Sequence, residues 1–211
     1  MIKFSFAIPV KDELIELQAL LRVLIKNKGE DDEIVIQFDS KNGSKMVEDF
    51  LRSHSINKDC GFRWHPYPFE GDFSKMKNNL INMCNGEYIF LIDADEIPNE
   101  SLINNISFIL ESNPEVEVFG VPRINIVHGI TQEHLLKWRW RLNDLGYINF
   151  PDWQFRIFKN NGKIKYKNKV HEQLTGYKTI SFFPETDSFS LIHIKEIERQ
   201  EKQNELYSKL I

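Results

Sequence analysis

The stretch that decides the fold is Tyr88-Ile89-Phe90-Leu91-Ile92-Asp93-Ala94-Asp95-Glu96. Its apolar run has no polar interruption, which is typical of a strand buried on both faces of a parallel sheet. Three carboxylates follow at the end of that run. Crowded carboxylates repel one another and hard cations prefer oxygen ligands, so the pattern predicts a Mg²⁺ or Mn²⁺ site. The alternative is a solvated acidic turn before a helix over 99–110.

Strand and helix patterns alternate upstream of this stretch. Short apolar runs predict strands over 4–8, 33–38 and 62–65, and apolar residues at helical spacing predict helices over 14–25, 44–52 and 72–84. The alternation predicts an α/β fold whose mostly parallel sheet is covered by helices on both faces. Ligands bind such sheets beyond the carboxyl ends of the strands. We therefore expect Pro9, Asp39 and Asp93 to share one crevice.

The second half of the chain has a different character. Strand patterns are short there, over 116–122, 124–128, 153–158, 163–166, 179–183 and 189–193, and a polar helix is predicted over 195–210. The segment 131–146 is rich in Trp, Arg and Leu and has no clear period. No linker or repeat separates the halves. We predict a single domain over 1–211, with a nucleotide-binding half over 1–98 and a smaller acceptor-side β region within 99–211.

Several segments, taken in chain order, share their pattern with one known family. They are Pro9-Val10-Lys11-Asp12-Glu13, Ile34-Val35-Ile36-Gln37-Phe38-Asp39-Ser40, Asp72-Phe73-Ser74-Lys75-Met76-Lys77-Asn78, Gly86-Glu87 with the stretch quoted above, Pro151-Asp152-Trp153-Gln154-Phe155-Arg156-Ile157-Phe158, and Val170-His171-Glu172. Together they resemble family 2 glycosyltransferases of the GT-A fold, best the bacterial branch that builds lipopolysaccharide core and related surface glycans. Lys77 stands where that family usually has Arg, and Asp12 where Asn is commoner. Lys41-Asn42-Gly43-Ser44 replaces the usual Ser-Thr-Asp ending of the second motif.

The resemblance implies a metal-dependent, inverting transfer of sugar from a nucleotide-sugar, with UDP as the expected nucleotide. On the donor side, the resemblance implies that Asp39 hydrogen-bonds the nucleotide base and that Pro9 and Asp12 line the same pocket. It implies that Asp93 contacts the ribose or the metal shell and that Asp95 coordinates Mn²⁺ or Mg²⁺ directly. Lys77 would face the diphosphate. We expect the diphosphate to face Asp93, Asp95 and Glu96. His193, before Lys202-Gln203-Asn204, resembles the family's C-terminal segment and is a candidate metal or phosphate ligand; the alternative is a structural histidine.

The acceptor-side roles also follow from the resemblance. An inverting transferase needs a base for the attacking hydroxyl, and the candidates are Asp152, which we prefer, and Glu172. His171, beside Glu172, and Arg156 are expected near the acceptor, and Trp153 could stack on a sugar face. The alternatives are a turn residue for Asp152, a surface ion pair for Glu172 and a cross-strand pair for Arg156. The acceptor is expected to be a glycan or a lipid-linked sugar, which places the chain in polysaccharide biosynthesis.

Composition and charge exclude other classes of protein. The net charge is −4 and no Lys/Arg-dense stripe occurs, so no nucleic-acid partner is expected. Cys60 and Cys84 are too few for a disulfide scaffold and form no metal-type pair. No apolar run approaches the ~18 residues of a membrane span. We expect a soluble, cytoplasmic protein, with peripheral membrane contact left open because many sugar acceptors are lipid-linked.

Three other functions fit parts of the pattern. A haloacid-dehalogenase-like phosphohydrolase also ends an apolar strand with Asp-x-Asp, but on a strand near the N-terminus and usually followed by Thr or Val, not by Glu96. A nucleotidyltransferase would need a Gly-rich phosphate loop near the first strand, where this sequence has none. A non-catalytic protein of the same fold that binds nucleotide or glycan is the remaining alternative, and a donor-hydrolysis assay separates it from a transferase.

Overall fold

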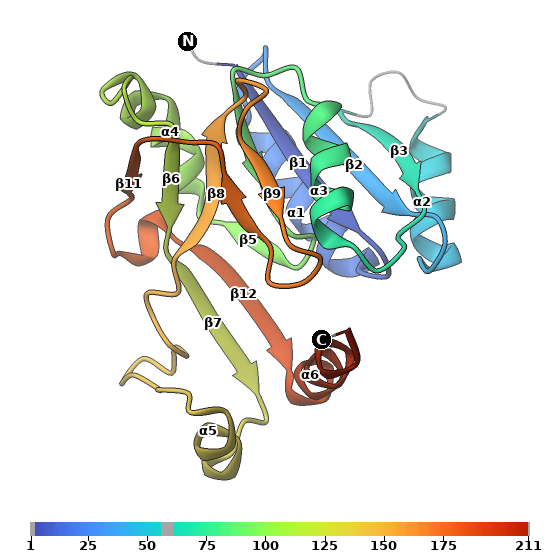
Figure 1. Cartoon of the computed structure of the whole chain (residues 1–211), viewed down its shortest axis with the longest axis vertical. Coiled ribbons are helices and arrows are strands. Elements are labelled where there is room, and N and C mark those ends of the chain that lie inside the picture. Colours follow the sequence, from blue (N-terminus) through green and yellow to red (C-terminus); the bar gives the residue numbers. More distant parts are fainter. Residues whose placement is uncertain (1–2, 56–60, 211) are drawn as a thin grey trace.

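The computed structural model describes residues 3–55 and 61–210, so Cys60 lies outside the described part of the chain. The central sheet (Figure 1) consists of β1 (Phe4–Val10), β2 (Glu33–Asp39), β3 (Arg63–Tyr67), β4 (Tyr88–Leu91), β6 (Val118–Val121), β8 (Gln154–Lys159) and β11 (Ile180–Phe182). Their order across the sheet is β11-β6-β8-β4-β1-β2-β3. The four strands of the N-terminal half therefore lie side by side at one end.

Strand direction confirms the predicted mostly parallel sheet. β2 and β4 run parallel to β1, and β3 runs parallel to β2. β8 is antiparallel to both of its neighbours, β4 and β6, while β11 is parallel to β6. Within this seven-stranded sheet, β8 is thus the strand that runs against the others. This reversal was not predicted, because an apolar run does not carry the direction of its strand.

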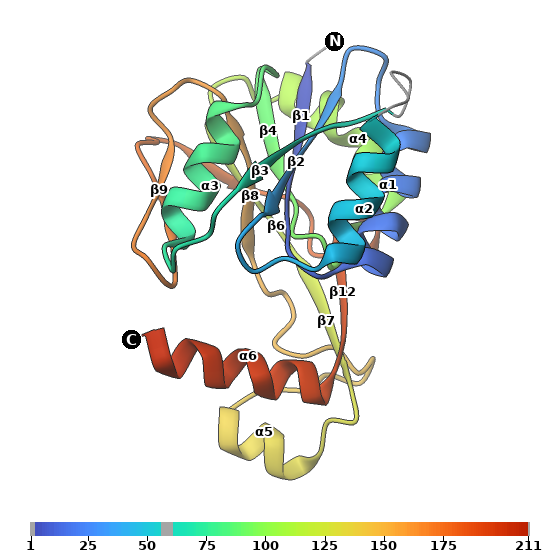
Figure 2. The same cartoon turned by 90° about the vertical axis from the view of Figure 1, so that its right-hand side faces the viewer.

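Helices cover both faces of the sheet (Figure 2). On one face lie α1 (Leu14–Asn27), α2 (Lys45–Ser55) and α4 (Glu100–Glu111), and on the other lies α3 (Phe73–Asn82). Alternate residues of β1 serve the two faces, because Phe6 packs in the cluster that contains the buried residues of α1, whereas Ala7 packs with those of α3. Phe119 and Ile157 of the second half belong to the same cluster as Phe6. The division into halves at residue 98 stays a prediction.

Local signals set where the site-bearing elements begin. Asp72 caps α3 by accepting a hydrogen bond from the backbone N of Lys75 at 3.0 Å. Gly86 precedes β4 at a close approach, since a Cβ atom there would lie 2.5 Å from the backbone N of Ser5. The chain therefore enters β4 pressed against β1, and the carboxyl ends of the two strands are brought to one edge.

A second sheet projects away from the central sheet (Figure 1). It consists of β5 (Glu96–Pro98), β12 (Leu191–Glu196) and β7 (Arg123–His128), in that order, with β12 antiparallel to β5 and parallel to β7. At its far end lie α5 (Gln132–Trp138), in the segment without a clear period, and α6 (Ile197–Leu210), as Figures 1 and 2 show. Beside α3 lies the hairpin of β9 (Lys165–Lys167) and β10 (Gln173–Thr175). None of the helices in the described residues is long and apolar enough to span a membrane.

Candidate active site

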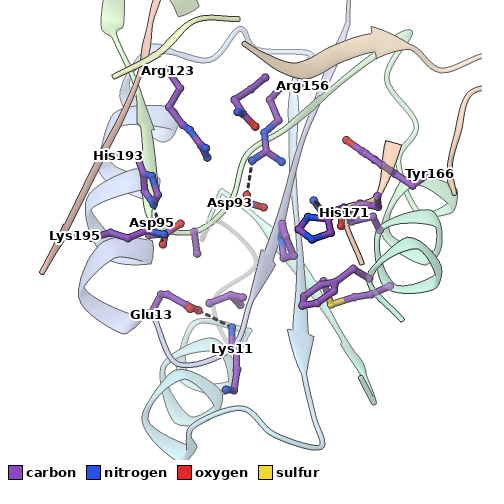
Figure 3. Close-up of a pocket in the computed structure, with 18 of the residues that line it drawn as sticks. Lys11, Glu13, Asp93, Asp95, Arg123, Arg156, Tyr166, His171, His193 and Lys195 are labelled. Atoms are coloured by element: carbon purple, nitrogen blue, oxygen red, sulfur yellow. Dashed lines mark hydrogen bonds and ion pairs between the residues drawn. The ribbon is translucent and has the colours of Figure 1, made fainter. Parts of the chain in front are cut away.

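A cleft of about 1440 Å³ opens at the carboxyl ends of β1, β2 and β4. Pro9, Asp39 and Asp93 all line it, so the predicted common crevice is confirmed. The other walls come from α3, β7, β8, β12, α6 and the segment around β10. Figure 3 shows Arg123, Arg156, His193 and Lys195 gathered around Asp93 and Asp95. Apart from Glu96, the residues to which the sequence assigned a role line this cleft: Pro9, Asp12, Asp39, Lys77, Asp93, Asp95, Asp152, Trp153, Arg156, His171, Glu172 and His193.

Asp39 organises two loops at the carboxyl end of β2. Its Oδ1 atom accepts hydrogen bonds from the backbone N atoms of Lys41, Asn42 and Phe69, at 3.0, 3.1 and 3.2 Å. Its Oδ2 atom accepts one from Asn42 Nδ2 at 3.0 Å. The carboxylate is buried. Its contacts therefore hold the loop after β2 against the loop after β3. Asp12 is exposed and lines the same cleft.

Glu96 is an internal anchor, and the expectation that the diphosphate faces it is wrong. It is fully buried at the start of β5. Its Oε1 atom accepts hydrogen bonds from Arg123 Nη1 at 2.7 Å and from Arg156 Nη2 at 2.9 Å, and Oε2 accepts one from the backbone N of Asp93 at 3.2 Å. The burial follows from the pairing of β5 with β12, which covers the acidic turn. Two of the three acidic side chains thus remain at the cleft surface.

Asp93 is held ionised by its surroundings. Burial alone would raise the pKa of its carboxyl, but the charges of Arg156 and Lys77 outweigh burial and hold that pKa well below its ordinary value. Arg156 donates from Nη2 to Asp93 Oδ2 as well as to Glu96, and Figure 3 shows its guanidinium beside the motif. Arg156, which was expected beside the acceptor, therefore pairs with two carboxylates of the acidic motif. Its buried Nε has no hydrogen-bond partner among the described residues.

Asp95, just before β5, contacts His193 of the neighbouring strand β12. Asp95 Oδ2 lies 3.3 Å from His193 Nε2, and His193 Nδ1 lies 2.9 Å from Asn125 Oδ1. An imidazolium donates from Nε2 to Asp95 and from Nδ1 to Asn125, and a cation bound between Asp95 and His193 would take the place of the Nε2 proton. Burial would raise the pKa of Asp95, but its hydrogen bond and charge interaction with His193 lower it. Two ligands of one cation at about 2.1 Å lie roughly 3.0–3.4 Å apart, so this pair of atoms fits divalent coordination.

Other protein ligands for a cation are few. Among residues 3–55 and 61–210, no group of three His, Cys, Asp or Glu side chains is placed to hold a metal ion. A cation at Asp95 and His193 would therefore take its remaining ligands from water and from the oxygens of a bound diphosphate, which is the usual arrangement for Mg²⁺ at a nucleotide site. Asp95 and His193 therefore fit a cation that binds together with a diphosphate.

Two basic residues that the sequence did not single out lie at the same place. Arg199 of α6 has Nη2 3.5 Å from Asp95 Oδ2, and it donates to Glu13 and Glu16 of the N-terminal half at 3.0 and 2.9 Å. Lys195 of β12 lines the cleft beside Asp95, as Figure 3 shows, and burial lowers its pKa. On a polar terminal helix such charges look solvated. Only the fold brings Arg199 to residues more than 180 positions earlier.

Lys77 and Glu172 form an ion pair in the floor of the cleft. Lys77 Nζ donates to Glu172 Oε1, and the Lys77 side chain is 9% exposed. Burial alone would lower the pKa of Lys77, but the negative charges of Asp93 and Glu172 contribute to raising it. The Tyr166 ring lies 5.1 Å from Nζ and completes the pocket. Lys77 is thus a buried cation between Asp93 and Glu172, not a solvated helix lysine.

Asp152 is enclosed by donors from two strands. Its Oδ2 atom accepts from Arg123 Nη2 at 2.6 Å and from Asn125 Nδ2 at 2.8 Å, and Oδ1 accepts from Gln154 Nε2 at 2.9 Å. Burial would raise the pKa of Asp152, but Arg123 and Asn125 lower it. Trp153 packs edge-on against Phe182 with the ring centroids 4.8 Å apart. Arg123, which sequence reasoning missed, joins Asp152 to Glu96, because it carries both ion pairs.

Comparisons with known proteins agree with this fold. The family model described as glycosyl transferase family 2 matches residues 5–184. A search of curated proteins finds no match. Among solved structures, S. aureus TarS 1-349 in complex with UDP-GlcNAc superposes with a TM-score of 0.66 at 14% identity, covering 92% of this chain and 58% of that one. The same TarS fragment with UDP gives a TM-score of 0.63 at 13% identity, covering 91% of this chain and 60% of that one.

A third structure is the mannosyltransferase PcManGT from Pyrobaculum calidifontis in complex with GDP-Man and Mn²⁺. It superposes with a TM-score of 0.60 at 13% identity, covering 90% of this chain and 56% of that one. At such identities the likeness shows the fold alone, which confirms the expected GT-A architecture. The chain spans less than two thirds of the length of each of these structures.

Proposed function

The chain belongs to glycosyltransferase family 2, and we propose that it transfers a sugar from a UDP-sugar to a glycan or lipid-linked acceptor, with inversion and with a divalent cation. The observation that carries the proposal is the meeting of Asp39, Asp93 and Asp95 in one cleft at the carboxyl edge of the sheet. This is where a doubly wound sheet binds a nucleotide. TarS structures hold UDP-GlcNAc and UDP, which supports a UDP-sugar here. The expected cytoplasmic setting stays a prediction.

The donor would lie along this edge from base to diphosphate. We assign the base to the loops that Asp39 holds, beside Pro9 and Asp12, and the ribose to Asp93. Asp95 and His193 would hold Mn²⁺ or Mg²⁺, and PcManGT carries Mn²⁺ in its complex. A cation bound there would neutralise the diphosphate leaving group. Lys195 and Arg199 supply further positive charge on the same side of the cleft.

The acceptor would enter between β8 and the segment before β10. We propose Asp152 as the base and keep Glu172 as its rival. Asp152 is ionised at neutral pH, because Arg123 and Asn125 lower its pKa, but the same donors make it a weaker base. Glu172 has one oxygen engaged by Lys77. In either case the base removes the proton of the attacking hydroxyl while that oxygen bonds to the anomeric carbon and the nucleoside diphosphate departs.

The decisive experiment measures UDP affinity with Mn²⁺ and with EDTA. We expect UDP to bind weakly in EDTA, because its diphosphate then meets Asp93 and Asp95 without a cation. Asp95→Ala should remove the metal dependence while the fold stays intact. Equal affinity for UDP in both conditions would contradict the metal site. Hydrolysis of UDP-sugars by the wild-type protein, with none by Asp95→Ala, would exclude a protein that only binds nucleotide or glycan.

A further inference from the structure

α5 and the loop that follows it lie at the far end of the second sheet, away from the central sheet (Figures 1 and 2). We name residues 132–146 the α5 arm. Leu136, Leu142 and Leu145 of this arm are 79%, 46% and 69% exposed, and α5 buries none of its residues. Leucines exposed together mark an interaction site more often than single exposed leucines do.

The α5 arm is an ordered platform, because its backbone is hydrogen bonded. Thr131 caps α5 together with His134, and Trp140 N donates to Leu135 O at 2.9 Å. Farther along, Arg141 N donates to Asn149 Oδ1 at 2.9 Å, and Asn149 N donates to Arg141 O at 2.8 Å. The exposure of the leucines is therefore a property of a defined surface.

Charge and aromatic character point to one kind of partner. Residues 136–142 read Leu-Lys-Trp-Arg-Trp-Arg-Leu and carry three positive charges. With Glu133 and Asp144 counted, the α5 arm has a net charge of +1, in a chain whose net charge is −4. Trp and Leu beside Lys and Arg are the side chains that enter the interface of an anionic bilayer. We propose that the α5 arm binds the surface of an anionic lipid membrane.

The α5 arm lies beside the cleft. Trp140 of the arm lines the cleft, as do Ile148 and Asn149 just beyond it. A membrane bound at Leu136 and Leu145 would therefore lie on the acceptor side of the cleft. That geometry suits a lipid-linked sugar as acceptor, and this point alone rests on the proposed function. Self-association through the arm is less favourable, because a two-fold contact would bring Lys137, Arg139 and Arg141 of two copies together.

Cosedimentation with vesicles tests the proposal without donor or acceptor, so its failure leaves the proposed transfer reaction intact. We expect the wild-type protein to bind phosphatidylcholine vesicles that contain phosphatidylglycerol, and to bind vesicles of phosphatidylcholine alone far more weakly. Lys137→Gln and Arg141→Gln should each lower the partition coefficient about fivefold. Leu136→Ser should lower it about tenfold. Added salt should weaken binding by screening the basic residues.

Phe108→Ser is the matched control, because Phe108 is 71% exposed on α4, away from the arm. It should bind vesicles as the wild type does. Absence of binding to anionic vesicles, or an equal loss in Phe108→Ser and Leu136→Ser, would overturn the proposal. So would a wild-type dimer that Leu136→Ser converts to a monomer, if neither form binds vesicles, because the arm would then be a contact between copies. Circular dichroism of each variant confirms that the fold is retained.

Discussion

The substitution Glu96→Gln tests the structural role of the buried carboxylate of the acidic motif apart from the roles of Asp93 and Asp95, which line the cleft. Gln keeps the shape of the side chain but loses the charge that faces Arg123 and Arg156. Both arginines pair with Glu96 Oε1, at 2.7 and 2.9 Å, in a fully buried position. The substitution therefore leaves two guanidinium groups with one fewer counter-charge in a site that water does not reach.

The magnitude follows from that geometry. Removing one partner of a buried ion pair costs about 3–5 kcal/mol, because the remaining charge is left uncompensated. Gln retains an acceptor oxygen, and Asp93 and Asp152 still pair with the two arginines, so we expect the lower end, about 3 kcal/mol. For a chain of this length that loss corresponds to a decrease of roughly 6–12 °C in Tm. Glu96→Ala would add a cavity and exceed it.

Asp95→Asn is the matched comparison. The distances from Asp95 Oδ2 to its partners are longer, 3.3 Å to His193 and 3.5 Å to Arg199. The substitution should therefore change the free energy of unfolding by less than about 1 kcal/mol. The assay is urea unfolding followed by circular dichroism, together with the Mn²⁺-dependent stabilisation by UDP. We expect Glu96→Gln to lose stability and Asp95→Asn to lose the metal response. A Glu96→Gln protein as stable as the wild type would refute the role of Glu96 as a buried anchor.

Three further predictions concern the base, pH and the charge of α6. Asp152→Asn should retain UDP binding and lose about 10²–10⁴-fold in kcat, with Glu172→Gln milder; a dead Glu172→Gln beside a near-normal Asp152→Asn would make Glu172 the base. The pKa values of Asp93 and Asp152 are lowered in the folded state, so their stabilisation is present above about pH 4 and is lost as the pH falls through the folded values; a Tm independent of pH in acid would contradict this. Arg199→Gln should raise the affinity for Mn²⁺ alone in calorimetric titration, because it removes a positive charge 3.5 Å from Asp95; unchanged affinity would exclude Arg199 from the field of the cation.

Local patterns in the sequence are enough to predict the parallel part of the sheet and the edge that carries the site. An uninterrupted apolar run and a helical period can each be recognised within a dozen residues, so these features need no knowledge of distant contacts. The carboxyl ends of parallel strands coincide, which is why the sequence alone could place Asp39 and Asp93 in one cleft. The family motifs likewise gathered Asp95, His193, Asp152 and Glu172 into that cleft.

What each side chain does in the cleft depends on tertiary contacts that no local pattern carries. Glu96 is an anchor because β12 pairs with β5 and buries it, and Lys77 meets Glu172 because the segment before β10 folds over α3. Arg123 and Arg199 reach the acidic motif from a strand and a helix far away in the chain. Such contacts arise from long-range strand pairing, and one polar residue in a local pattern looks the same whether its partner is water or a buried carboxylate.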